Sequence, residues 1–148
     1  MTTLTQSRTV TPDTRPSAKR HMFLRALGAA LALGVAYIHV RDQGGFPGDK
    51  SPTYIAIGYY LLEVAGVGTA IALLGASMKH LGTVWALTIG VALGPLAGFV
   101  LSRGLGLPLY TEDRGNWTET LAVVSILVEG ALLVLAAVVI GRSRRSAG

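Results

Sequence analysis

Four apolar stretches, each about 20 residues long, are the feature that most restricts how this sequence can fold. They cover residues 22–40, 54–76, 81–101 and 120–140. A helix of about 20 apolar residues crosses the roughly 30 Å of hydrocarbon in a bilayer. Because lipid offers no hydrogen bonds, each such stretch must satisfy its own backbone polar groups. We therefore predict an all-α membrane protein, with four transmembrane helices packed as an antiparallel bundle.

Composition supports the membrane class. Hydrophobic residues make up 51% of the chain and charged residues 14%, and the mean hydropathy is +0.52. These values depart from those of an average soluble protein. The absence of cysteine excludes disulfides and thiolate metal sites. The net charge of +5 could suggest a nucleic-acid partner, but the basic residues stand at the ends of the apolar stretches, so we expect none.

Lys and Arg are unevenly distributed between the two predicted membrane faces. Nine flank the chain ends or the short middle turn, whereas four belong to the two long loops. The positive-inside rule then places both termini in the cytoplasm and both long loops outside. We predict a multi-pass plasma-membrane protein with a disordered cytoplasmic tail over 1–21, a transmembrane domain over 22–141 and a basic cytoplasmic tail over 142–148.

Two of the predicted helices carry a carboxylic acid inside an apolar run. Glu63 lies in "YYLLEVAGVG" and Glu129 in "SILVEGALL", each about ten residues from the predicted outer end of its helix. At about 1.5 Å per residue, both acids are expected about 15 Å below that end, close to the midplane. A charge there costs at least about 2.5 kcal/mol, so such residues face a bundle interior or water and are candidate functional groups.

These acids admit two interpretations. If their side chains meet, they would share a proton or bind a cation, because two like charges repel each other strongly in a dry site. Alternatively, each acid is a hydrogen-bonding clamp between helices, satisfied by nearby hydroxyl groups. Tyr59 and Tyr60 could serve Glu63, and Ser125 could serve Glu129. The matched depth of the two acids favours the ion-binding interpretation.

The two halves of the sequence follow one pattern. Each has an Arg at the end of an outward helix, a loop with Gly and Pro, and a returning helix whose Glu stands twelve residues before a Gly. The corresponding residues are Arg41, Glu63 and Gly75 in the first half, and Arg103, Glu129 and Gly141 in the second. A 2+2 internal repeat explains this pattern, and so does a chance match between apolar helices of limited alphabet.

Polar groups near the predicted outer face complete the candidate site. His39 and Arg103 are expected at the entrance to an ion site, with Arg41 in a supporting position. The weak candidates for metal ligands are His39, Asp42, Glu112 and Asp113. A hydrogen-bonded interfacial histidine is the alternative interpretation of His39. We predict no cofactor.

The third apolar stretch contains Gly90, Gly94 and Gly98 at intervals of four residues, with Pro95 directly after Gly94. Small residues at this spacing form a smooth ridge that lets another helix approach closely. We predict that the ridge packs a helix, either within the bundle or at a homodimer seam.

The loop segments "RDQGGFPGDKSPTY" and "SRGLGLPLYTEDRGNWTE", together with the acid-bearing helices that follow them, resemble those of small four-helix membrane proteins of actinobacterial type. The function of that group is unassigned. The resemblance covers residues 22–141 and implies a four-helix architecture in a bacterial inner membrane. It implies no activity.

No soluble catalytic motif occurs, neither a phosphate-binding glycine loop nor HExxH nor a nucleophile elbow, so we expect the chain not to be an enzyme. Two function classes remain. The first is a small proton- or cation-coupled carrier that uses Glu63 and Glu129 as paired intramembrane carboxylates. The second is a non-catalytic accessory or assembly subunit of a larger membrane complex. Besides the bilayer, the expected partners are therefore a second copy or such a complex.

Overall fold

A computed structural model of the protein describes residues 18–145, and this part of the chain is helical apart from its turns and loops. The helices are α1 (Ala18–Asp42), α2 (Thr53–Gly75), α3 (Leu81–Arg103) and α4 (Thr120–Arg145). Each has at least 23 residues and is long and apolar enough to cross a membrane. The prediction of an all-α chain with four membrane-length helices is confirmed, and these helices support a multi-pass membrane protein.

The helices extend beyond the apolar stretches at the charged ends. Residues 18–21 belong to α1, although we expected them in the tail, and α4 continues from residue 140 to Arg145. Hydropathy marks where contact with lipid ends, whereas helical hydrogen bonding continues through Lys and Arg, which are good helix formers. The remaining predicted tail residues, 1–17 and 146–148, lie outside the described part of the chain.

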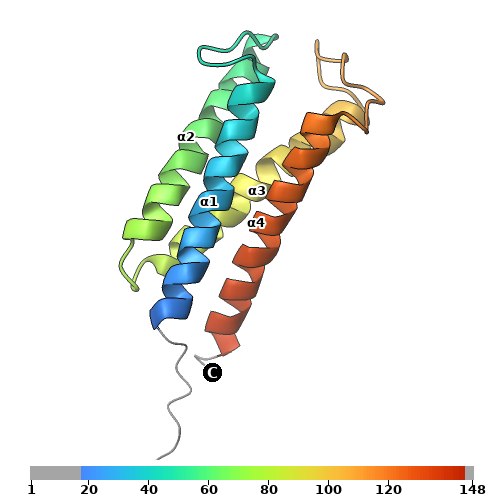
Figure 1. Ribbon diagram of the computed structural model, residues 1–148. Helices are drawn as coiled ribbons and strands as arrows, with labels where there is room; N and C mark the ends of the chain where they lie inside the picture. The colour runs from blue at the N-terminus through green and yellow to red at the C-terminus, as the bar shows by residue number, and fades with distance from the viewer. Residues whose placement is uncertain (1–17, 146–148) are drawn as a thin grey trace, which may run out of the picture.

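The four helices form two hairpin pairs, α1 with α2 and α3 with α4, which also contact each other through α1 and α4 and through α2 and α3. Figure 1 shows the long loops 43–52 and 104–119 at one end of the molecule, which we call the loop end. The start of α1, the turn 76–80 and the end of α4 lie at the opposite end, the tail end. Polar groups from both loops therefore gather at one end.

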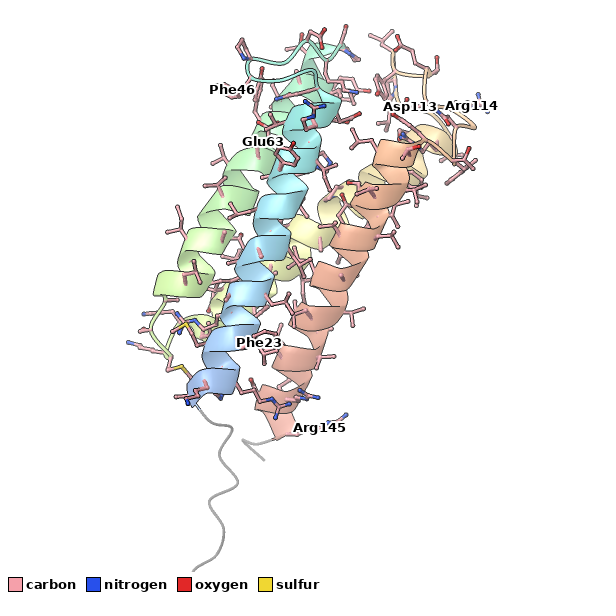
Figure 2. All side chains as sticks on the ribbon, viewed as in Figure 1. Phe23, Phe46, Glu63, Asp113, Arg114 and Arg145 are labelled. Carbon is pink, nitrogen blue, oxygen red and sulfur yellow. The ribbon has the colours of Figure 1, made fainter. Side chains whose placement is uncertain are left out.

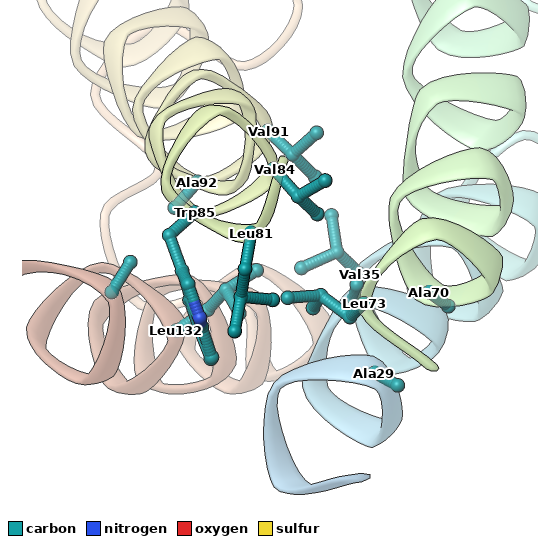
Figure 3. Close-up of a cluster of buried hydrophobic side chains, with 12 residues drawn as sticks. Ala29, Val35, Ala70, Leu73, Leu81, Val84, Trp85, Val91, Ala92 and Leu132 are labelled. Atoms are coloured by element: carbon teal, nitrogen blue, oxygen red, sulfur yellow. The ribbon is translucent and has the colours of Figure 1, made fainter. Parts of the chain in front are cut away.

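The hydrophobic core lies toward the tail end and joins all four helices. Figure 3 shows Val35 of α1, Leu73 of α2, Trp85 of α3 and Leu132 of α4 in one cluster. Trp85 is only 2% exposed, and its ring lies so close to α1 that a Cβ added at Gly28 would be 2.8 Å from Cη2. The core therefore joins the four helices in the tail half of the bundle.

Close packing of α1 on α2 depends on small residues. A Cβ added at Gly66 would lie 2.9 Å from the carbonyl oxygen of Ala32 and 3.1 Å from the Cβ of Ala36. A real side chain at position 66 could not be accommodated without moving a backbone. Gly66 was not singled out in the sequence, because with Ala70 it forms a single pair of small residues four positions apart, a spacing that is common in apolar helices.

The predicted glycine ridge has a different environment. A Cβ added at Gly90, Gly94 or Gly98 would meet nothing within 4 Å, so within residues 18–145 no helix packs closely on the ridge. Regular spacing of glycines shows that a helix surface is smooth, but it does not determine what covers that surface. Of the two alternatives we stated, packing within the bundle is not what the structure has, and a homodimer seam stays a prediction.

Arg25 ties α1 to the tail end of α2. Its side chain is 9% exposed and donates hydrogen bonds to the carbonyl oxygens of Leu73, Leu74 and Ala76, at 2.5, 2.8 and 2.7 Å. The last carbonyls of a helix lack intrahelical donors and carry partial negative charge, so a guanidinium satisfies both needs. In the sequence this residue counted only as an orientation signal.

We predict that Gly66→Leu destabilises the protein, because the added side chain would force α1 and α2 apart. Overpacking of this kind costs about 1–3 kcal/mol. The measurement is the free energy of unfolding of the purified protein in a denaturing-detergent titration. Gly68→Leu is the matched control, since a Cβ there meets nothing within 4 Å. Equal losses in both variants would contradict the assigned role of Gly66.

Candidate functional site

A cavity of about 880 Å³ lies between the helices and reaches from the bundle interior to the loop-end residues. Its walls are mostly apolar and come chiefly from α2 and α3. The charged or titratable side chains that line it are His39, Asp42, Tyr54, Tyr59, Arg103, Tyr110, Asp113 and Glu129. The chemistry available to a ligand in this cavity is therefore decided by a small number of polar groups in an apolar chamber.

One long side of the cavity is open. Leu61 of α2 and Leu87 of α3 line the cavity and are more than half exposed, and Gly90 and Gly94 on the ridge are exposed lining residues as well. The opening therefore runs between α2 and α3, along helix surfaces that lipid would cover in a membrane.

Glu129 is the candidate acid that lies in the cavity wall. It is 1% exposed, and its Oε1 accepts a hydrogen bond of 2.6 Å from the hydroxyl of Ser125, one helical turn earlier. Within residues 18–145, no salt bridge to Glu129 is found. Its carboxyl group is thus held by one neutral donor and is almost completely covered, in the wall of a chamber large enough for a ligand.

Glu63 lies elsewhere, between α1 and α2. It is 7% exposed and does not line the cavity, and its Oε1 accepts a hydrogen bond of 2.7 Å from Nε2 of Gln43. Figure 2 shows Glu63 close to the first loop. Within the described chain, no hydrogen bond joins Glu63 to Glu129, so the structure does not bring the two acids together in this way.

The position of Gln43 explains why equal spacing along the two helices does not give equivalent surroundings. Gln43 is the first residue after α1, so Glu63 reaches the end of α1 although it is ten residues inside α2. Counting residues along one helix gives the depth of a side chain relative to that helix alone. The groups that this side chain can bond depend on where the neighbouring helix ends. No signal in the sequence pointed to Gln43, because an isolated polar loop residue is usually exposed.

The tyrosines predicted to support Glu63 instead bind the first loop and the end of α1. The hydroxyl of Tyr60 accepts a hydrogen bond of 2.9 Å from the backbone N–H of Gly48, and the hydroxyl of Tyr59 donates to Asp42. Lys50 completes this network with an ion pair of 3.1 Å to Asp42. Together with Gln43, these contacts fasten the loop onto the ends of α1 and α2.

His39 is a buried hydrogen-bonded residue at the end of α1. Its Nδ1 lies 2.9 Å from the carbonyl oxygen of Val35, and because a carbonyl can only accept, Nδ1 carries the hydrogen. The imidazole packs edge-on against Tyr59, with 5.2 Å between ring centroids. This arrangement leaves Nε2 as the ring atom available for proton exchange or ligation.

Arg103 organises the second loop. Its Nη1 lies 3.1 Å from Asp113 and 3.2 Å from the Ser102 hydroxyl, and its Nη2 lies 2.6 Å from Glu119. The guanidinium also stacks on Phe99, 4.7 Å from the ring centroid. Arg103 is 8% exposed, and its Nε has no hydrogen-bond partner among the described residues. Its two carboxylate partners more than compensate its single positive charge.

Tyr110, which the sequence did not indicate, supports the same cluster. Its hydroxyl donates a hydrogen bond of 2.9 Å to Asp113, and its backbone forms a tight turn with Leu107. Burial and the nearby Asp113 raise the pKa of the Tyr110 phenol above its ordinary value, so it stays a donor at physiological pH. No sequence pattern identified this residue, since its role depends on the fold of the loop.

The remaining predicted groups do not assemble into a site. Arg41 and Glu112 are exposed, and within residues 18–145 there is no group of three or more His, Asp or Glu side chains that could hold a metal ion. Asp42 and Asp113 have their own cationic partners. Arg41 and Arg103, which correspond in the proposed repeat, thus have different environments.

Comparison of the chain with protein-family models, with curated proteins and with solved structures finds no match. Any functional conclusion must therefore come from the geometry of the cavity itself.

We predict that Arg103→Gln destabilises the loop end, because Asp113 and Glu119 would lose their shared cation. A hydrogen bond to a charged group contributes about 1.5–3 kcal/mol, so the free energy of unfolding should fall by about 2 kcal/mol. Arg114→Gln, in the same loop but exposed, is the control and should change it little. If both substitutions have the same effect, the assigned role of Arg103 is wrong.

Proposed function

We propose that this protein is a small proton- or cation-coupled carrier of a bacterial inner membrane, in which Glu129 binds the exchanged ion. The chain would cross the membrane as an antiparallel four-helix bundle. Both termini would be cytoplasmic and the loop end would face outward. The excess of Lys and Arg at the tail end supports this orientation.

The single observation that carries the proposal is the position of Glu129. A carboxyl group that served only to stabilise the bundle would be expected to form a hydrogen bond to a neighbouring helix. Glu129 instead accepts its hydrogen bond from Ser125 of its own helix, and it stands in the wall of a chamber of about 880 Å³. Because an intramembrane acid is costly, a binding role accounts for its presence better than a packing role does.

Under this proposal the two acids have different roles. Glu63 would fasten the first loop through Gln43, since its hydrogen bond joins α2 to the residue that follows α1. Glu129 would exchange protons or cations in the cavity. The sequence-based hypothesis of a paired site is thereby narrowed to one acid, and Glu63 takes the alternative role of a clamp.

We predict that Glu129→Gln abolishes cation-driven proton movement, because glutamine cannot exchange a proton or carry charge. The assay uses purified protein in liposomes with an imposed pH gradient and a pH-sensitive dye. A panel of inorganic cations and organic amines is added in turn, and the rate of gradient collapse is measured.

Glu63→Gln is the matched control and should retain the wild-type rate, since it preserves a hydrogen-bonding side chain outside the cavity. Unfolding titrations verify that both variants are folded. The carrier proposal fails if the wild type responds to no cation in the panel, or if Glu129→Gln responds like the wild type.

A second candidate function, a non-catalytic accessory subunit, is favoured by the apolar tips of the loops. Phe46 in the first loop is 77% exposed, and Leu105 and Leu109 in the second are 79% and 90% exposed. Leu109 also has a φ of 58°, a conformation that usually requires glycine or asparagine. A rigid turn that presents leucine in this way is suited to contact with a partner.

We predict that, if the accessory role holds, native purification in mild detergent recovers a second protein in fixed ratio. Leu109→Asn, which suits the backbone conformation but removes the apolar tip, should release that partner without unfolding the chain. Recovery of the isolated protein as a single monodisperse species would argue against this role.

A further inference from the structure

We propose that the cargo of this cavity is an amphipathic cation, with one ammonium-type head and an apolar body. The inference rests on the proposed carrier function and identifies the chemical class that it would move. The head would lie at Glu129, and the body would occupy the space between α2 and α3, entering from the lipid through the open side of the cavity.

The charges of the cavity determine where a cation can bind. Asp42 is paired with Lys50 at 3.1 Å, and Asp113 is paired with Arg103 at 3.1 Å. Glu129 is the remaining acid in the wall, and among the described residues no cationic side chain is paired with it. A positively charged ligand would supply the missing partner, whereas the two aspartates already have theirs.

The same charges disfavour an anion. Arg103 is the cationic residue of the cavity wall, and its guanidinium already lies against both Asp113 and Glu119. One positive and two negative charges therefore make this cluster net negative. An anionic head placed there would have to compete with two carboxylates for one guanidinium.

The shape and chemistry of the open side require an apolar body. Gly90, Gly94 and Gly98 line the α3 wall, and added Cβ atoms there meet nothing within 4 Å, so the helix surface leaves room for an occupant. Leu61 and Leu87 flank this space and are exposed. A ligand that contacts these groups must be as apolar as the lipid it displaces.

The proposal is tested with three rod-shaped diphenylhexatriene probes that carry a trimethylammonium group, no charge or a propionate. The full chain is placed in phosphatidylcholine nanodiscs, and energy transfer from tryptophan to the probe is measured against empty discs. Trp117 is a suitable donor because its ring packs on Phe99, which lines the cavity, with 5.6 Å between centroids. We expect saturable binding of the cationic probe, about tenfold or more tighter than that of the other two.

Substitutions test where the charged head and the apolar body of the ligand bind. Glu129→Gln should weaken binding of the cationic probe about tenfold and leave the neutral probe unchanged. Gly94→Leu should weaken binding of all three probes by filling the groove. Gly82→Leu is the control for Gly94→Leu, since it lies on the same helix, has equal free space and is outside the cavity wall.

The outcomes separate this inference from the carrier function. Equal binding of the three probes by the wild type, or a preference for the cation that survives in Glu129→Gln, would overturn the inference. Either result leaves the proton-movement assay of Glu129→Gln as an independent test of the carrier. Conversely, Glu129-dependent binding of the cationic probe without proton movement would support the ligand class and refute the carrier.

Discussion

Helices in lipid gain little from burying apolar side chains against one another, because lipid tails are apolar too. Close approach of backbones and a few well-satisfied polar bonds must therefore hold this chain together. Both are found toward the tail end, where Trp85 packs on Gly28 and Arg25 caps the end of α2. The remainder of the structure depends on these contacts. Trp85 joins the second hairpin to the first, and Arg25 joins α1 to α2 within the first hairpin.

The loop half of the molecule is joined in a different way. Its contacts are polar and involve the loops themselves, such as the hydrogen bond of 2.6 Å from Tyr54 to the carbonyl oxygen of Pro108. Arg103 fastens the second loop, and Asp42 fastens the first. Because these bonds connect loops rather than pack helices, they leave an interior volume unfilled. The cavity begins among these loop contacts and extends between α2 and α3 as far as Ala72 and Val84, where it meets the core.

The features that sequence could predict are local ones. The presence of a helix follows from the hydropathy of a single segment. All four helices were predicted, and their predicted ends differ from those in the structure by a few residues. Glu129 could also be found, because an acid in an apolar run is costly whatever surrounds it. Neither conclusion needs knowledge of which helices are neighbours.

The features that sequence could not predict depend on the relative level and rotation of two helices. Gln43 became the partner of Glu63 because α1 ends beside it. Gly66, which has a small residue four positions on but belongs to no series of glycines, makes the close contact, whereas the ridge at Gly90 and Gly94 faces open space. Spacing along one helix describes the surface of that helix. Which helix covers that surface depends on how the helices pack.

The division between packed and tethered halves also constrains how the proposed carrier could work. Glu129 would have to become accessible from the tail end, yet the core around Trp85 and Leu132 closes that path. In α3, Ala92 belongs to the core and Val91 belongs to both the core and the cavity wall, whereas Pro95 lines the cavity alone. Proline cannot donate the backbone hydrogen bond of its turn, so the helix is most easily bent at this border. Bending there would move the core-forming part of α3 relative to the cavity wall, which is the movement that opening toward the tail end requires.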